Sequence, residues 1–242
     1  MGESERYQEY KDFRRKKRFS FLRNGNSVIA LIIFNLVFFI TLYFIKVGFY
    51  YAGSNTLSFN KEILDWLALP ADLTRFSERP WSLISFMFAD DSSMLIRLVS
   101  NLFWLWAFGQ MMQEMGGNDK TISVYLYGGV AGGLFFMLTA SVFPAMNPGE
   151  NTSLLGASTA VMAVAAATTS LDPDYRFYRH IRNGIPIWVL FVFYATIDLL
   201  GIGALNATLI AHVAGGLSGF LFVWFLRKGK DGSKWMNHLY QQ

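Results

Sequence analysis

Two side chains that could act together as nucleophile and base lie far apart in the sequence. Ser158 follows Gly156 and Ala157 in an alanine-rich apolar segment, and His212 is the only histidine inside a long apolar segment. A serine hydroxyl becomes a nucleophile when an imidazole within hydrogen-bond reach takes its proton. The two residues therefore predict acyl-transfer chemistry, provided that the fold brings the two segments together.

Each of these signals is weak when it is taken alone. A serine among alanines commonly packs helices together, and a lone intramembrane histidine is as often structural as functional. Gly215 and Gly219 have the four-residue spacing that allows close helix approach, which is also common. Acyl attack needs in addition a donor for the oxyanion, and the side-chain amide of Asn101 is a candidate. Only the combination favours an enzyme.

The composition predicts the kind of scaffold that must position these residues. Of the 242 residues, 53% are hydrophobic and only 16% are charged, whereas soluble domains have about 25% charged residues. The charges are clustered between long apolar stretches, which is typical of a polytopic helical membrane protein. Cysteine is absent, which excludes a thiol nucleophile, a disulfide framework and a cysteine metal site. No metal or cofactor is indicated.

The apolar stretches predict an all-α fold, a bundle of six transmembrane helices. Residues 52–93 are too polar to span, and we expect a structured first loop with short helices at the membrane interface, where Trp66 and Trp81 are well suited. The expected spans cover residues 27–51, 94–112, 121–143, 154–170, 187–200 (possibly to 205) and 207–226.

The fourth expected span, residues 154–170, differs from the others. Seventeen residues make a helix of about 25 Å, which is shorter than a hydrocarbon core of about 30 Å. The segment is rich in Ala and Thr and has no large aromatic residue. We therefore expect a helix buried at the centre of the bundle, with one end recessed below the membrane surface where water can enter.

The basic residues predict the orientation in the membrane. A tail over residues 1–26 holds eight Lys or Arg residues, and a second tail covers residues 227–242. With both tails in the cytoplasm, sixteen of the twenty-one Lys and Arg residues lie on the inner side, as the positive-inside rule requires. The basic tail is better explained by this rule and by the lipid bilayer than by nucleic acid, which we do not expect as a partner.

The same orientation places three polar residues at similar depth. The second, fourth and sixth spans would all begin on the outer side, with Asn101, Ser158 and His212 about 6 to 11 Å below the helix starts. Polar groups at that depth are costly unless they pair or line a wet cavity. We therefore expect the three side chains to converge.

At these residues the sequence resembles the rhomboid family of intramembrane serine proteases, from the first span to the last. The pattern Gly-x-Ser is present as 156–158, and Ala-His-x-x-Gly-x-x-x-Gly is present as 211–219. The segment 101–109, Asn-Leu-Phe-Trp-Leu-Trp-Ala-Phe-Gly, resembles the family's second span. The resemblance implies that Ser158 is the nucleophile and His212 its general base, without a carboxylate. It also implies that the Ser158 N–H and Asn101 stabilise the oxyanion.

The sequence departs from the family pattern at several positions near these residues. Arg97 stands four residues before Asn101, where the family usually has His. It could donate to the oxyanion or only reach the outer interface, and the sequence leaves both open. Met162 stands where an aromatic residue often packs on the catalytic His, and its sulfur can also pack against a ring. We expect Gly156, Met162 and Gly215 to pack near Ser158 and His212 or to contact substrate.

Three further ionisable residues invite a catalytic interpretation that we do not favour. Asp198 lies toward the outer end of the fifth span, so its depth allows a triad, but we expect a capping or interfacial role. His180 and His238 lie on the cytoplasmic side and are expected to be solvated.

The sequence as a whole predicts an intramembrane serine endopeptidase. Its expected partners are transmembrane protein substrates with small or helix-breaking residues near the outer membrane edge, as the resemblance implies. A non-catalytic relative that binds or escorts membrane proteins is the alternative; Arg97 favours it, and the presence of both Ser158 and His212 opposes it. A transporter would need a charged path through several spans, which the sequence lacks. The compact six-span form suggests a bacterial inner membrane.

Overall fold

The computed structural model describes residues 26–53, 56–91, 95–146, 152–177, 184–202 and 206–235. Within these residues the chain is mostly helical, as the sequence predicts. The basic tail lies outside them apart from Asn26, and His180 and His238 lie outside them as well.

In the described part of the chain, six helices have fourteen residues or more and make up the bundle. Within the described residues, three of them are long and apolar enough to cross a membrane: α2 (Ser27–Tyr51), α8 (Asn118–Val142) and α11 (Ala207–Arg227). Two shorter apolar helices are α9 (Ser158–Leu171) and α10 (Ile187–Ile202). The sixth, α7 (Leu95–Gly116), has a lower mean hydropathy because it carries several polar residues. Three spans are therefore supported by length and composition, where the sequence predicts six.

The first loop folds into short elements, as expected. In order, they are α3 (Thr56–Phe59), the π-helix η1 (Asn60–Leu64), α4 (Asp65–Leu67), strand β1 (Leu69–Pro70), α5 (Leu73–Glu78) and α6 (Ser82–Ser85). Trp66 and Trp81 stack with their ring centroids 5.9 Å apart, and Nε1 of Trp81 donates to the carbonyl of Trp66. The remaining short elements are η2 (Pro144–Met146), β2 (Ser153–Leu154), β3 (Arg176–Phe177) and β4 (Ile185–Pro186).

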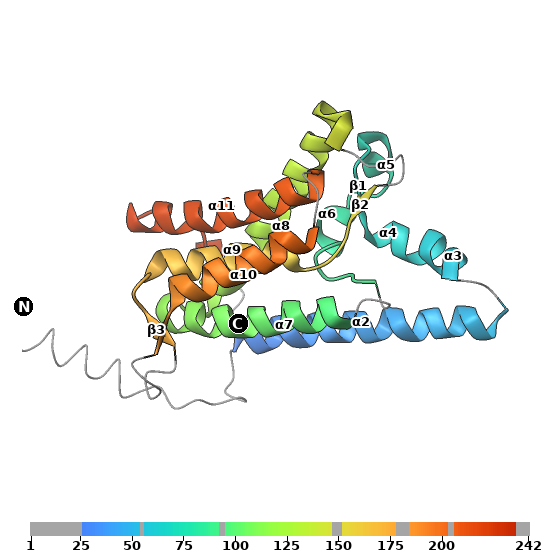
Figure 1. Cartoon of the computed structure of the whole chain (residues 1–242). Coiled ribbons are helices and arrows are strands. Elements are labelled where there is room, and N and C mark those ends of the chain that lie inside the picture. The colour runs from blue at the N-terminus through green and yellow to red at the C-terminus, as the bar shows by residue number, and fades with distance from the viewer. Residues whose placement is uncertain are drawn as a thin grey trace, which may run out of the picture.

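Helix α9 lies at the centre of the bundle, where it contacts α7, α8, α10 and α11 (Figure 1). All its residues from Ser158 to Thr168 are buried. Its small side chains allow this close packing: a Cβ added at Gly128 of α8 would lie 2.1 Å from the Cβ of Ala163. The sequence-based expectation of a central, small-residue helix is confirmed.

The start of α9 differs from the prediction. The expected helix begins at Leu154, but this residue is in β2, and the helix begins at Ser158 itself. The cause is Gly156, whose φ of +110° does not fit a right-handed helix. Ser158 therefore stands at the helix N-terminus and not one turn inside the helix.

Candidate active site

The chain before Ser158 is held in place by backbone hydrogen bonds. Strand β2 pairs antiparallel with β1 of the first loop, with Leu154 opposite Leu69, and the Gly156 N–H donates to the carbonyl of Phe86 at 2.9 Å. The first N–H groups of a helix have no acceptor within the helix, and no side chain caps α9. The first turn of α9 is thus a set of donors beside the Ser158 hydroxyl, which is the arrangement that stabilises a nearby oxyanion.

Ser158 and His212 meet inside the bundle. Oγ of Ser158 lies 3.1 Å from Nε2 of His212, and the two residues are only 7% and 4% exposed. This is hydrogen-bond distance. In the tautomer with a free Nε2 lone pair, His212 accepts a hydrogen bond from the Ser158 hydroxyl. Residues 54 positions apart are therefore brought together as the sequence predicts.

Two glycines allow α11 to approach α9 closely enough for this contact. A Cβ added at Gly215 would lie 2.5 Å from the carbonyl oxygen of Thr159, and one at Gly219 would lie 2.1 Å from that of Ala163. Both distances are shorter than any real Cβ contact, and both atoms belong to rigid backbone. The four-residue spacing of Gly215 and Gly219 thus allows α11 to pack closely against α9, as the sequence predicts.

The other nitrogen of the His212 ring also has a partner. Nδ1 lies 2.5 Å from Oδ2 of Asp198 on α10, and the two side chains are 5% and 13% exposed. The capping or interfacial role expected for Asp198 is wrong, because its carboxylate contacts the imidazole. Its depth allows this contact, but the rotation of α10 that turns Asp198 toward His212 could not be read from the sequence.

Asn101 is a buried residue of α7 whose side-chain amide is not fully paired. The residue is 5% exposed, and its Nδ2 has no hydrogen-bond partner among the described residues. A buried donor without a partner costs about 1–3 kcal/mol. Such a donor is suited to a ligand oxygen, and this agrees with an oxyanion role without placing Asn101 in contact with Ser158.

Arg97 binds a carboxylate of the first loop. Its Nε lies 2.9 Å from Oδ1 of Asp90, and Nη2 contacts the same oxygen. Asp90 is buried, whereas the Arg97 side chain is 41% exposed. Burial raises the pKa of Asp90 above its ordinary value, although the ion pair with Arg97 opposes that shift. From the sequence, Arg97 could be either an oxyanion donor or an interfacial residue. The structure adds a third role for Arg97, as the partner of Asp90.

Arg97 and Asp90 also adjoin the segment that leads to Ser158. A Cβ added at Gly156 would lie 3.7 Å from Oδ2 of Asp90 and 3.9 Å from Nε of Arg97. The ion pair therefore lies beside the turn that starts α9. Asp90 could not be linked to Arg97 from sequence, because Asp90 lies outside the helices and strands and its position depends on tertiary contacts.

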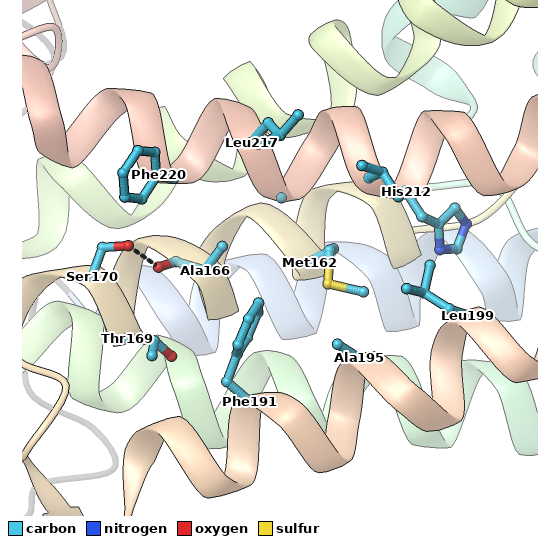
Figure 2. A pocket seen from close by; sticks show the side chains of 12 residues that line it. Met162, Ala166, Thr169, Ser170, Phe191, Ala195, Leu199, His212, Leu217 and Phe220 are labelled. Carbon is cyan, nitrogen blue, oxygen red and sulfur yellow. Dashed lines mark hydrogen bonds between the residues drawn. The ribbon is translucent and has the colours of Figure 1, made fainter.

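An apolar cleft of about 460 Å³ opens beside the Ser158–His212 pair, between α9, α10 and α11. Figure 2 shows His212 and Leu199 at one end and Met162 near its middle. Phe191, Thr169 and Phe220 lie toward the other end. Met162 and His212 thus line one cleft, in keeping with the expected place of Met162 near the pair.

The family model for the Rhomboid domain matches residues 77–229, which is more than half of the chain. The chain belongs to the rhomboid family. The match includes Asn101, Ser158, Asp198 and His212, whereas α2 lies outside it. Rhomboid membership and the apolar helices together make this a membrane protein.

A search of curated proteins finds a distant relative of this rhomboid chain. The "RHOMBOID-like protein 12, mitochondrial" of Arabidopsis thaliana is 27% identical over 144 residues, which cover 55% of this chain and 43% of the relative. The chain thus matches less than half the length of that protein. The predicted bacterial inner membrane stays a prediction.

Proposed function

We propose that this rhomboid chain is an intramembrane serine endopeptidase that uses Ser158 and His212. The observation that carries the proposal is the distance of 3.1 Å between Oγ of Ser158 and Nε2 of His212 inside an apolar bundle. Both residues are buried, which is costly for polar groups unless they pair or act on a ligand.

The reaction follows from the roles of the two side chains. Oγ of Ser158 attacks the carbonyl carbon of the substrate peptide bond while Nε2 of His212 takes the hydroxyl proton. The N–H groups of the first turn of α9 and the amide of Asn101 stabilise the oxyanion that forms. His212 gives the proton to the departing amine, and an acyl ester remains on Ser158. Water then attacks this ester with His212 again as base, which releases the acid product and restores the serine.

Six spans with cytoplasmic termini are part of the same proposal. Residues 27–226 form the protease domain, and residues 1–26 and 227–242 are the cytoplasmic tails. Helices α9 and α10 would complete the spanning bundle as short helices. At fourteen residues α9 is about 21 Å long, and its Ser158 end would lie below the outer surface. Substrates are transmembrane segments of other membrane proteins, cleaved near the outer edge of the membrane.

The test is cleavage of a single-span model substrate by the purified protein in liposomes. We expect cleavage by the unaltered protein and none above background by Ser158→Ala or His212→Ala. Ser218→Ala is a matched control on α11, because its hydroxyl donates to the carbonyl of Gly215 within the same helix. Cleavage that survives Ser158→Ala would contradict the proposal.

A non-catalytic protein that binds or escorts membrane proteins is the second candidate. The observation in its favour is Arg97, which replaces the family's usual His and is bound to Asp90. This candidate predicts binding of a transmembrane segment without cleavage, and equal binding by Ser158→Ala. Cleavage that requires Ser158 would contradict it.

A further inference from the structure

His212 makes a second contact that the proposed reaction does not use. Its Nδ1 lies 2.5 Å from Oδ2 of Asp198 on α10, while its Nε2 lies 3.1 Å from Oγ of Ser158 on α9. Each ring nitrogen therefore has one partner, and the two partners come from different helices. An imidazole bound on both sides has a fixed orientation and a preferred tautomer.

The position of Asp198 is unfavourable for an acidic residue that has no such partner. It is the only charged residue of α10, and most of the others are apolar. It lies one turn before the end of that helix, where the helix dipole disfavours negative charge. Its side chain is mostly buried, and acidic groups in such surroundings require pairing. Among the described residues, His212 provides that pairing.

We propose that Asp198 is a positioning residue that holds His212 in the Nδ1–H tautomer and stabilises the imidazolium formed during catalysis. The inference rests on the proposed peptidase function. When Nδ1–H donates to Asp198, Nε2 keeps the lone pair that accepts the Ser158 proton. When Nε2 has taken this proton, the positive ring lies beside the Asp198 carboxylate.

A purely structural role would have different consequences. If Asp198 only linked α10 to α11, its loss would lower the free energy of unfolding and leave kcat per folded molecule unchanged. The value of kcat per folded molecule therefore separates the two roles, and the tautomer, which does not depend on catalysis, shows whether Asp198 orients the ring for the reaction.

The tautomer can be measured by NMR of ¹⁵N-histidine in the whole detergent-solubilised chain. The Ser158→Ala background removes the hydroxyl that would itself favour a free Nε2, and His212→Ala in the same background identifies the signals of His212 among the three histidines. At about pH 9, an ordinary imidazole is neutral. We expect a proton on Nδ1 in Ser158→Ala alone, and a shift toward Nε2–H when Asp198→Ala or Asp198→Asn is added. An unchanged tautomer would overturn the proposal.

Kinetics provide the second readout. Asp198→Asn has nearly the shape of the native side chain, and we expect its kcat to fall between about tenfold and about 10⁴-fold, the loss that follows replacement of the Asp in soluble serine-protease triads. KM should stay near that of the unaltered protein, because the lost interaction belongs to the transition state. Leu200→Ala, at an exposed position of the same helix, is the control and should leave kcat unchanged. An unchanged kcat in Asp198→Asn would overturn the proposal.

The two readouts also separate this proposal from the proposed function. If the unaltered protein cleaves no substrate, the peptidase function fails and the tautomer alone decides whether Asp198 positions His212. If the protein cleaves and neither kcat nor the tautomer depends on Asp198, the function stands and the positioning role fails.

Discussion

At the scale of single residues, the site is defined by polar groups that are buried at a cost. Ser158 and His212 bond to each other, whereas Nδ2 of Asn101 has no partner among the described residues. Because an unpaired buried donor is unfavourable in the resting protein, Asn101 is poised to gain a bond when a negative oxygen forms nearby. Its contribution should therefore appear in the transition state more than in substrate binding.

Replacing Asn101 tests this expectation. We expect Asn101→Ala to lower kcat by about 10²- to 10³-fold, the effect of removing one oxyanion donor, with little change in KM and no loss of stability. Asn35→Ala is the matched control: this buried asparagine of α2 donates to the Leu31 carbonyl and the Tyr125 hydroxyl. Its loss should lower the unfolding temperature and leave kcat per folded molecule unchanged. Equal effects of the two variants on kcat would argue against an oxyanion role.

The pair formed by Arg97 and Asp90 predicts an asymmetric response to mutation. Arg97→Ala leaves a buried carboxylate without its cation and should cost about 1–3 kcal/mol of unfolding free energy. Because burial raises the pKa of Asp90, the protonated carboxyl is favoured in the folded state. Its contribution to the free energy of unfolding is present below the ordinary pKa of Asp and is lost as pH rises through the folded pKa. Asp90→Asn should therefore cost little at pH 7, since Arg97 can be solvated.

A double-mutant cycle measures this coupling by thermal unfolding. Asp90→Asn combined with Arg97→Ala should be more stable than Arg97→Ala alone. Additive losses would mean that the pair contributes nothing at this site.

Residue types and spacing were sufficient to predict the Ser158–His212 contact, since both lie in apolar segments with distinctive neighbours. They did not predict the partners of Arg97 and Asp198. The depth of Asp198 can be estimated from sequence but the rotation of α10 cannot, and Asp90 lies outside the helices and strands, where its position depends on tertiary contacts.

At the scale of elements, the site depends on the contact between α9 and α11. Helix α9 begins at Ser158 because Gly156 breaks the helix and the preceding strand β2 pairs with β1. Helix α11 brings His212 to this end through glycines that lie against backbone atoms of α9. The small-residue pattern predicted a central α9, but apolar composition alone could not distinguish a strand from the first turn of the helix, so the predicted start was four residues early.

Enlarging a contact glycine tests the role of this helix pair. A Cβ at Gly219 would lie 2.1 Å from the Ala163 carbonyl oxygen, so Gly219→Ala must move α11 away from α9. We expect a loss of about 1–3 kcal/mol, as for other overpacked cores, and a lower kcat because the Ser158–His212 distance increases. Gly201→Ala in α10 is the control, since a Cβ there meets nothing within 4 Å. An active, equally stable Gly219→Ala would contradict the packing described above.

At the scale of the whole molecule, polar contacts join the segment after α11 to the start of α8. Ser233 donates to Asp119 at the start of α8 and to Asp231, and Lys120 lies 3.5 Å from Asp231. These contacts fix the chain beyond α11 to the first turn of α8, next to the helix that carries His212. Hydropathy predicts the helices themselves, but it gives no information on such contacts between residues more than a hundred positions apart.

This cluster of polar contacts predicts a pH dependence of stability. Partial burial raises the pKa of Asp231, but hydrogen bonds from Ser233 and attraction to Lys120 outweigh it and hold the pKa below the ordinary 3.8. Its contribution is therefore present above about pH 4 and is lost as pH falls through the lower folded value. We expect Asp231→Asn to lower the unfolding temperature at pH 7 and to have little effect near pH 2, whereas the exposed Asp174→Asn should have little effect at either pH. An equal loss for Asp231→Asn at both pH values would contradict the assignment.

The most direct test of the central claim is covalent labelling of the whole chain with a fluorophosphonate, followed by mass spectrometry of its peptides. This reagent reacts with a serine only when a neighbouring base activates the hydroxyl. We predict one labelled residue, Ser158, and a labelling rate at least about 10²-fold lower in His212→Ala, as expected when a general base is removed. Labelling of Ser158 at an undiminished rate in His212→Ala, or no labelling of Ser158 in the unaltered protein, would contradict the account.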